Sequence, residues 1–147
     1  MPLYEVLPHL YLADYESAKD CFLEDAYIVN CTKDLPMLSQ QGMRLAVDDN
    51  RSATSMREMF NALPSTTDTI HERIQQGQNV LVHCQAGRQR SAAVVSAYLV
   101  RHNGLSLEDA VRHVRNKKPD AFFWEVNFKD ALEWFAMLST SSDRCTA

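Results

Sequence analysis

The stretch that decides the fold is VLVHCQAGRQRSAAVV, residues 80–95. Residues 80–82 are a short, unbroken apolar run that leads into His83 and Cys84, as in a strand that a parallel sheet buries on both faces. A second run, 92–100, is apolar nearly all round and predicts a buried helix. The polar residues between the two runs therefore form a tight loop that joins a central strand to a central helix.

Strand-like and helix-like patterns alternate on both sides of this loop. Short apolar runs predict strands, and apolar positions at helical spacing predict helices. The expected strands are 3–7, 10–14, 26–32, 43–47 and 79–83, the first two at a sheet edge. The expected helices are 17–25, 54–77, 92–104, 107–118 and 125–138, and we expect Pro64 to kink or restart the second of them.

This alternation predicts an α/β fold, with a central, mostly parallel sheet that helices flank on both faces. The loop after Cys84 then lies at the carboxyl end of a middle strand, where open α/β sheets bind their ligands. The 147 residues of the chain match the length of one domain. We therefore expect a single domain over 1–147, whose tail frays from about residue 139.

The overall charge limits the partners that the chain can attract. The net charge is −4 at pH 7, so bulk attraction to nucleic acid or to an anionic membrane is not expected, and any anion must be recognised locally. No apolar run approaches the roughly 18 residues of a membrane span, and the N-terminus lacks a basic start followed by an apolar core. We expect a protein that is neither secreted nor membrane-spanning, in the cytoplasm with nuclear entry left open.

The cysteines favour reduced thiols over a metal site. Cys21, Cys31, Cys84 and Cys145 show no C-x-x-C pairing and no histidine at metal-ligand spacing, which counts against a disulfide framework and against a zinc site. We expect no metal and no cofactor. Cys31 has two interpretations, core packing or a redox pair with Cys84 if their strands are adjacent.

The loop after Cys84 has the features of an anion-binding site. Backbone N–H groups in a glycine-containing loop that leads into a helix point towards a bound anion, and the helix dipole favours negative charge there. Phosphate is the natural occupant, and Gly87 permits the backbone angles of a tight loop. The expected phosphate-binding residues are Gln85, Ala86, Gly87, Arg88, Gln89 and Arg90.

The same loop carries a candidate nucleophile. A helix N-terminus beside arginine favours the thiolate form of a cysteine, so we expect Cys84 to attack phosphorus. Arg90 can hold two phosphate oxygens bidentately and stabilise the charge that they carry in the transition state, and Ser91 can donate a hydrogen bond to the sulfur. A cysteine after an apolar strand is usually just a small buried hydrophobe, but these neighbours in register favour the catalytic interpretation.

These residues also carry a family resemblance. HCQAGRQRS, residues 83–91, resembles the H-C-x-x-G-x-x-R-[ST] signature of cysteine-dependent phosphatases of the protein tyrosine phosphatase superfamily. The most similar members are the small (atypical) dual-specificity protein phosphatases. The resemblance runs from about Tyr4 to Leu138, and it includes EVLPHLYLADYESAKD (5–20), YIVNCT (27–32) and AYLVRHNGLSLEDAVRHVRNKKP (97–119).

The resemblance implies a two-step hydrolysis. The Cys84 thiolate would form a phosphocysteine while an aspartic acid protonates the leaving oxygen, and the same aspartate would then activate water. The family's acid follows the strand that reads LAVDD in this chain, which points to Asp49. Asp48 stays open, because the following loop is about four residues longer than a short family loop. Asn30 matches an asparagine that would brace the signature loop.

The resemblance also implies a substrate class. Phosphotyrosine and phosphoserine or phosphothreonine on proteins are the expected substrates. Arg88, a second basic residue in the loop, also resembles relatives that dephosphorylate phosphoinositides or other phospholipids. A third possibility, a nucleic-acid 5′-phosphatase, ranks lower because the net charge is acidic, and a catalytically weak phosphopeptide-binding module is the alternative outside enzymes. The oligomeric state is not predicted.

Overall fold

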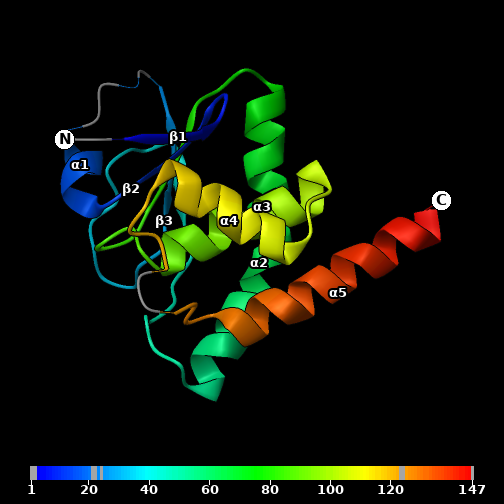
Figure 1. Ribbon diagram of the computed structural model, residues 1–147. Helices are drawn as coiled ribbons and strands as arrows, with labels where there is room; N and C mark the ends of the chain where they lie inside the picture. Colours follow the sequence, from blue (N-terminus) through cyan, green and yellow to red (C-terminus); the bar gives the residue numbers. More distant parts are fainter. Residues whose placement is uncertain (1–2, 21–22, 24, 123–124, 147) are drawn as a thin grey trace.

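The computed structural model describes residues 3–20, 23, 25–122 and 125–146 (Figure 1). The strands are β1 (Tyr4–Leu7), β2 (Leu10–Ala13), β3 (Tyr27–Asn30), β4 (Gly42–Arg44) and β5 (Val80–His83). The helices are α1 (Tyr15–Lys19), α2 (Ala53–Gln75), α3 (Arg90–Asn103), α4 (Leu107–Lys117) and α5 (Lys129–Thr146).

The strands form one sheet in the order β1-β2-β5-β3-β4. Only the β1–β2 pair is antiparallel among the described strands, since β2, β5, β3 and β4 pair in parallel. The expected α/β fold with a mostly parallel sheet is confirmed. The edge position expected for residues 10–14 is wrong, because β2 pairs with β5 as well as with β1.

Helices cover both faces of the sheet, as expected (Figure 1). One face carries α2 to α5, and alternate strand residues such as Leu12, Val29 and Val82 point into that core. The other face carries α1, over a smaller cluster that includes Ile28 and Leu81. The side chains of β5 alternate between the two faces, and each of its residues is buried, because β5 is the central strand.

α1 and α5 differ most from the expected helices. α1 begins at Tyr15, where the Asp14 side chain caps it by accepting a 2.7 Å hydrogen bond from the Ser17 N–H, and it ends at Lys19. Residues 21, 22 and 24 of the predicted helix lie outside the described residues. At the other end of the chain, α5 continues to Thr146, beyond the expected end at residue 138, and the fraying expected from about residue 139 stays a prediction.

α2 is one helix that runs through Pro64 instead of restarting there. Proline lacks an N–H, so the carbonyl four residues earlier loses its helical partner. Just beyond the proline, the Thr67 hydroxyl donates to the carbonyl oxygens of Leu63, at 2.8 Å, and of Pro64, at 3.2 Å. Packing of the buried Met59, Leu63 and Ile70 against α3 and α5 holds the helix together across this gap.

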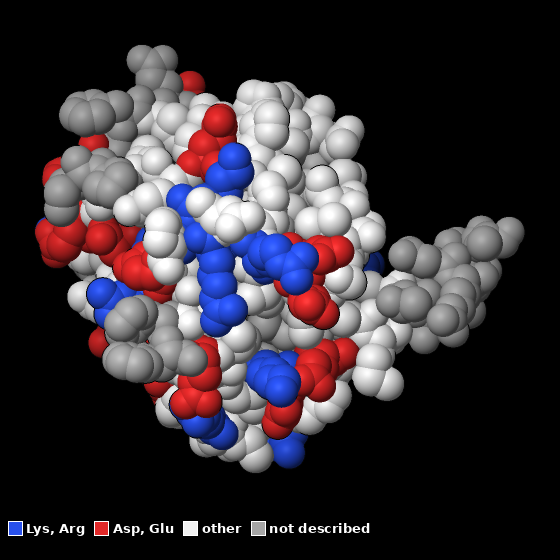
Figure 2. Space-filling model, in the orientation of Figure 1, with Lys and Arg blue, Asp and Glu red and all other residues white. Residues whose placement is uncertain are grey.

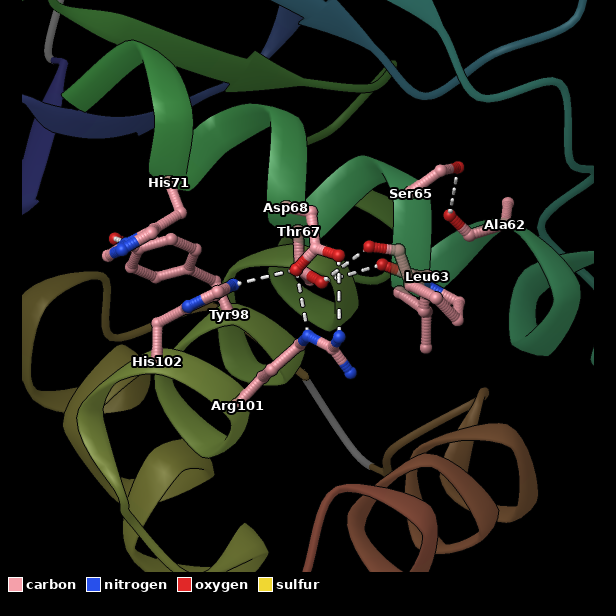
Figure 3. Close-up of polar contacts among 10 residues, drawn as sticks. Ala62, Leu63, Ser65, Thr67, Asp68, His71, Tyr98, Arg101 and His102 are labelled. Carbon is pink, nitrogen blue, oxygen red and sulfur yellow. Dashed lines mark hydrogen bonds and ion pairs between the residues drawn. The ribbon is translucent and has the colours of Figure 1, made fainter. Parts of the chain in front are cut away.

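A polar cluster joins α2 to α3 (Figure 3). The rings of His71 and His102 stack with centroids 4.1 Å apart, and His71 Nδ1 lies 3.2 Å from the Tyr98 hydroxyl. The Asp68 carboxylate accepts from Arg101 Nε at 2.8 Å and lies 3.1 Å from His102 Nε2. These contacts attach the C-terminal half of α3 to α2.

We expect the free energy of unfolding to fall as the pH drops below about 6.5. Burial lowers the pKa of His83 and, together with the neighbouring His71, the pKa of His102. The unfolded chain then binds protons more readily than the folded chain, so these histidines favour the fold above their ordinary pKa of about 6.5 and lose that contribution below it. Urea unfolding between about pH 7 and about pH 5 measures the effect, and His102→Gln should flatten the slope. A pH-independent free energy of unfolding over this range would contradict the prediction.

Candidate active site

The loop that follows β5 lies at the carboxyl end of the central strand and at the N-terminus of α3. We call residues 84–90 the signature loop. The sheet topology and the helix dipole therefore both favour anion binding at this position. None of the described residues form a group of three or more histidine, cysteine or carboxylate side chains that could hold a metal.

Three carbonyl groups of the signature loop accept hydrogen bonds from residues outside the loop, which orients the peptide groups. The carbonyl oxygen of Gln85 accepts from the Tyr15 N–H at 3.1 Å, that of Arg88 from the Phe122 N–H at 2.7 Å, and that of Gln89 from the Ala93 N–H at 2.8 Å. In a trans peptide the next N–H points away from the carbonyl. The N–H groups of residues 86, 89 and 90 therefore point to the side opposite these outer partners, which makes a cradle for an anion.

Gly87 lets the loop close tightly. Its φ is +71°, and a Cβ at this position would lie 2.8 Å from the carbonyl oxygen of Ala13. The loop thus packs directly on the end of β2, where only glycine combines this backbone angle with this approach. The Gly87 N–H points at the Cys84 Sγ, 3.2 Å away.

Cys84 is 3% exposed, and its sulfur faces the loop interior. Its Sγ lies 3.2 Å from the Ser91 Oγ as well as from the Gly87 N, so two hydrogen-bond partners meet at the sulfur. Cys31 occupies the corresponding position after β3, since its N–H donates to the His83 carbonyl at 2.8 Å. Burial, then the nearby Cys84, raises the pKa of Cys31 well above its ordinary value, so at neutral pH Cys31 is a thiol.

Arg90 carries an unused donor beside the loop. Its Nη1 donates to the carbonyl oxygen of Val47 at 3.1 Å, which attaches the residues before Asp48 to the guanidinium. Its Nε is buried and meets no hydrogen-bond partner among the described residues. Buried polar atoms are normally paired, so this unpaired N–H is a candidate donor to a ligand oxygen.

The two candidate acids have different neighbours, although both are exposed. The Asp48 carboxylate forms an ion pair with Lys33 at 3.2 Å, and Lys33 also lies 3.8 Å from Glu58. The Asp49 Oδ1 instead accepts from the Asn127 Nδ2 at 3.0 Å. Asp49 is therefore connected to the segment before α5, which in turn contacts the signature loop.

Two side chains of the signature loop point to the segment between α4 and α5. Gln89 is 7% exposed, and both ends of its amide bond to the backbone of residues 125 and 127. Arg88 Nε donates to the Asp120 carboxylate at 3.2 Å, and the buried Lys118 also pairs with Asp120. Partial burial raises the pKa of Asp120, but the bonds to Lys118 and Arg88 outweigh it and hold this pKa below its ordinary value.

The expectation for Asn30 is wrong. Its side-chain amide donates to the carbonyl oxygens of Leu35, at 2.9 Å, and Pro36, at 3.2 Å, and its oxygen accepts from the backbone and hydroxyl of Thr32. Asn30 thus braces the β3–β4 connection instead of the signature loop. The segment after β3 turns back over the strand end, which brings its own carbonyl groups within reach.

Charges of both signs cover the face that α4 crosses. Figure 2 shows basic side chains in the middle of this face with acidic side chains on both sides of them. Arg112 on α4, for example, pairs with Glu108 and with Asp109. Such a mixed surface lacks the extended positive stripe with which proteins follow a nucleic-acid backbone.

The sequence matches the model of the dual specificity phosphatase catalytic domain over residues 10–136. The chain belongs to this family. The family assigned from the resemblance is thus confirmed, and the signature loop described above lies within the matched residues.

Individual relatives agree with this family. The chain is 30% identical to the tyrosine-protein phosphatase MSG5 of Saccharomyces cerevisiae over 145 residues, which cover 96% of the chain and 29% of that protein. It is also 30% identical to the phosphatidylglycerophosphate phosphatase PTPMT1 of Arabidopsis thaliana over 101 residues, 69% of the chain and 29% of that protein. The crystal structure of human DUSP28(Y102H) superimposes with a TM-score of 0.84 at 27% identity, covering 97% of the chain and 99% of that structure.

The dual specificity phosphatase relatives are mostly longer proteins. Across the curated relatives cited above and others, the chain spans between 18% and 64% of the relative's length. The described helices include no segment with the length and apolar character that crossing a bilayer requires.

The sequence did not reveal the residues that connect this loop to the rest of the phosphatase domain. Asn127, Glu125 and Asp120 lie more than thirty positions after the loop residues that they contact, so no local spacing links them. Gln89 is one of the expected phosphate-binding residues, but its side chain is buried against residues 125–127, so its backbone N–H is the group that can face the anion.

Proposed function

We propose that this chain is a cysteine-dependent phosphatase that hydrolyses phosphotyrosine and phosphoserine or phosphothreonine on proteins through a phosphocysteine intermediate. The observation that carries the proposal is the position of the Cys84 Sγ, 3.2 Å from both the Gly87 N and the Ser91 Oγ, in a loop that leads into a helix. The orphaned Arg90 Nε supports it, because a bound phosphate oxygen satisfies that donor.

In the first step the Cys84 thiolate attacks phosphorus as the bond from phosphorus to the leaving oxygen breaks. The phosphoryl group moves to sulfur, and the leaving oxygen takes the proton of Asp49. The loop N–H groups and the Arg90 guanidinium hold the non-bridging oxygens, whose charge they stabilise in the transition state.

In the second step a water molecule attacks the phosphocysteine. The Asp49 carboxylate accepts a proton from the water, the phosphorus–sulfur bond breaks, and inorganic phosphate leaves. The electron pair of that bond returns to sulfur, where the Ser91 hydroxyl and the Gly87 N–H stabilise the thiolate again. No metal or cofactor takes part in either step.

We assign the general acid to Asp49 instead of Asp48. The Asp48 carboxylate is held in an ion pair with Lys33, which lies on the connection between β3 and β4. Asp49 bonds to Asn127, whose segment contacts the signature loop through Gln89. The carboxylate of Asp49 is thus connected to the loop that holds the phosphate.

We expect Asp49→Asn to slow the hydrolysis of phenyl phosphate on the order of 10²-fold, because an acid contributes most when the leaving group is poor. The loss on p-nitrophenyl phosphate, whose leaving group is better, should be much smaller. Asp48→Asn is the matched control and should lower both rates little. Steady-state kcat on the two esters measures this, and a larger leaving-group dependence in Asp48→Asn would transfer the role to Asp48.

A phospholipid phosphatase of the same fold is the second candidate function. Arg88 lies in the loop, and the Arabidopsis relative is a phosphatidylglycerophosphate phosphatase by name. In this chain, however, the Arg88 guanidinium already pairs with Asp120, so its charge is partly neutralised. This contact favours phosphoprotein over a more highly charged lipid headgroup.

A substrate panel under reducing conditions tests the proposed function. We expect the wild-type chain to hydrolyse a phosphotyrosine peptide and a phosphothreonine peptide, and to act weakly on a phosphoinositide and on a 5′-triphosphorylated RNA. Phosphate release is the measurement. Turnover confined to the lipid would establish the second candidate, and binding of both peptides without any turnover would establish a phosphopeptide-binding module.

The proposal extends to domain organisation and location. We propose that 1–147 acts as a single catalytic domain, and that it works in the cytoplasm, where the thiol pool is reducing. Glutathione and thioredoxin there keep a nucleophilic cysteine such as Cys84 in the reduced form that the mechanism needs.

A further inference from the structure

The segment 125–127 is attached to the signature loop by one side chain. The Gln89 Nε2 donates to the carbonyl oxygen of Glu125 at 2.8 Å, and its Oε1 accepts from the N–H of Asn127 at 2.9 Å. Both halves of the amide are therefore used, and the side chain is buried. A buried amide with both partners in place fixes the backbone that it bonds to.

The same segment is also attached to the candidate acid. The Asn127 Nδ2 donates to the Asp49 Oδ1 at 3.0 Å, and Arg51, two residues after Asp49, forms an ion pair with Glu125. Figure 1 shows the residues that lead into α5 beside those that lead into α2. Gln89 and Asn127 thus form a two-residue bridge from the signature loop to Asp49.

Asp49 needs such a bridge. It is exposed and belongs to a stretch without regular structure, and an exposed carboxylate has several rotamers. A general acid works only when its proton lies within hydrogen-bond reach of the leaving oxygen. The Asn127 amide occupies Oδ1, which leaves Oδ2 as the oxygen that carries the proton.

We propose that Gln89 and Asn127 are positioning residues that hold the Asp49 carboxyl group over the phosphate site. Gln89 fixes the backbone of residues 125–127, and Asn127 orients Asp49 from that backbone. The inference rests on the proposed function, in which Asp49 is the general acid. It goes further because it couples the geometry of the acid to a residue of the phosphate-binding loop itself.

The test is a double-mutant cycle read with two substrates. The proteins are wild type, Asn127→Ala, Asp49→Asn and the double variant, assayed on phenyl phosphate and p-nitrophenyl phosphate. We expect Asn127→Ala to lower kcat on phenyl phosphate about 10-fold, as the loss of one hydrogen bond predicts. The loss on p-nitrophenyl phosphate should be much smaller, and in the Asp49→Asn background Asn127→Ala should have no further effect.

Two further variants separate positioning from folding. Gln89→Ala leaves Asn127 in the chain but removes the side chain that fixes its backbone. This variant should also lower kcat more on phenyl phosphate than on p-nitrophenyl phosphate. Asn103→Ala, at the exposed C-terminal end of α3, removes an asparagine away from the loop and should change neither rate. Circular dichroism of each variant shows whether it is folded.

The outcomes distinguish this inference from the function on which it rests. Equal losses on both esters in Asn127→Ala, or a loss that persists in the Asp49→Asn background, would overturn the positioning role alone. If Asp49→Asn itself showed no leaving-group effect, Asp49 would not be the general acid, and the positioning role would fail as well. The proposal is supported if Asn127→Ala and Asp49→Asn each slow phenyl phosphate hydrolysis much more than p-nitrophenyl phosphate hydrolysis. Asn127→Ala must also have no further effect in the Asp49→Asn background.

Discussion

Cys84→Ser is expected to abolish turnover of every phosphomonoester and to leave phosphate binding in place. A serine hydroxyl ionises far less readily than a cysteine thiol, so the attacking anion is lost. The loop N–H groups and Arg90 stay, and they hold the substrate without cleaving it. We expect kcat on a phosphotyrosine peptide to fall on the order of 10⁵-fold or more, as loss of a covalent nucleophile does in other hydrolases.

Cys31→Ala is the matched control for this variant. Cys31 is buried just after the neighbouring strand β3, and its raised pKa keeps it protonated at neutral pH, so kcat per folded molecule should persist. Fluorescence anisotropy with the labelled peptide measures whether Cys84→Ser still binds. Turnover that survives in Cys84→Ser, or that disappears in folded Cys31→Ala, would contradict the assignment of the nucleophile.

Arg90→Lys is expected to lower kcat/KM on the order of 10³-fold, although it keeps the positive charge. Lysine has no planar fork, so it cannot bind two phosphate oxygens at once. It also lacks the Nε–H that is buried and orphaned beside the loop. Losses of this size follow removal of preorganised donors that stabilise a transition state.

Inhibition by inorganic phosphate gives a second measurement for Arg90→Lys, because the guanidinium should also hold the free anion. Arg112→Lys is the control, since Arg112 is exposed on α4 and pairs with Glu108 and Asp109. It should leave both quantities unchanged. A loss of ten-fold or less in Arg90→Lys would mean that the loop N–H groups suffice and that Arg90 mainly holds the Val47 carbonyl.

Local patterns predicted the part of the fold that positions the site. The apolar runs on either side of the signature loop correspond to β5 and α3, because burial on both faces removes the alternation seen in a half-exposed strand. Packing overrode propensity elsewhere. Pro64 stays inside α2, and β2 lies between two strands although its sequence resembled an edge.

For the candidate site too, the sequence predicted some residues and not others. Cys84, Gly87 and Ser91 meet because they lie within eight consecutive residues, 84–91, so their spacing alone indicates the cradle. Asn127 and Asp120 reach the loop only through the path of the chain between α4 and α5, and no short motif encodes that path. Asn30 was misjudged because its partners depend on how the β3–β4 connection turns.

The most direct test of the central claim is to find the phosphoryl group on sulfur. Asp49→Asn, which should hydrolyse the intermediate slowly, is mixed with p-nitrophenyl phosphate, quenched in acid within the first turnover and digested, and the peptides are examined by mass spectrometry. We predict a phosphoryl group on the peptide that contains Cys84, localised to that cysteine and absent from Cys84→Ser. A variant that releases phosphate without any phosphorylated Cys84, or that carries the group on another residue, would contradict the mechanism.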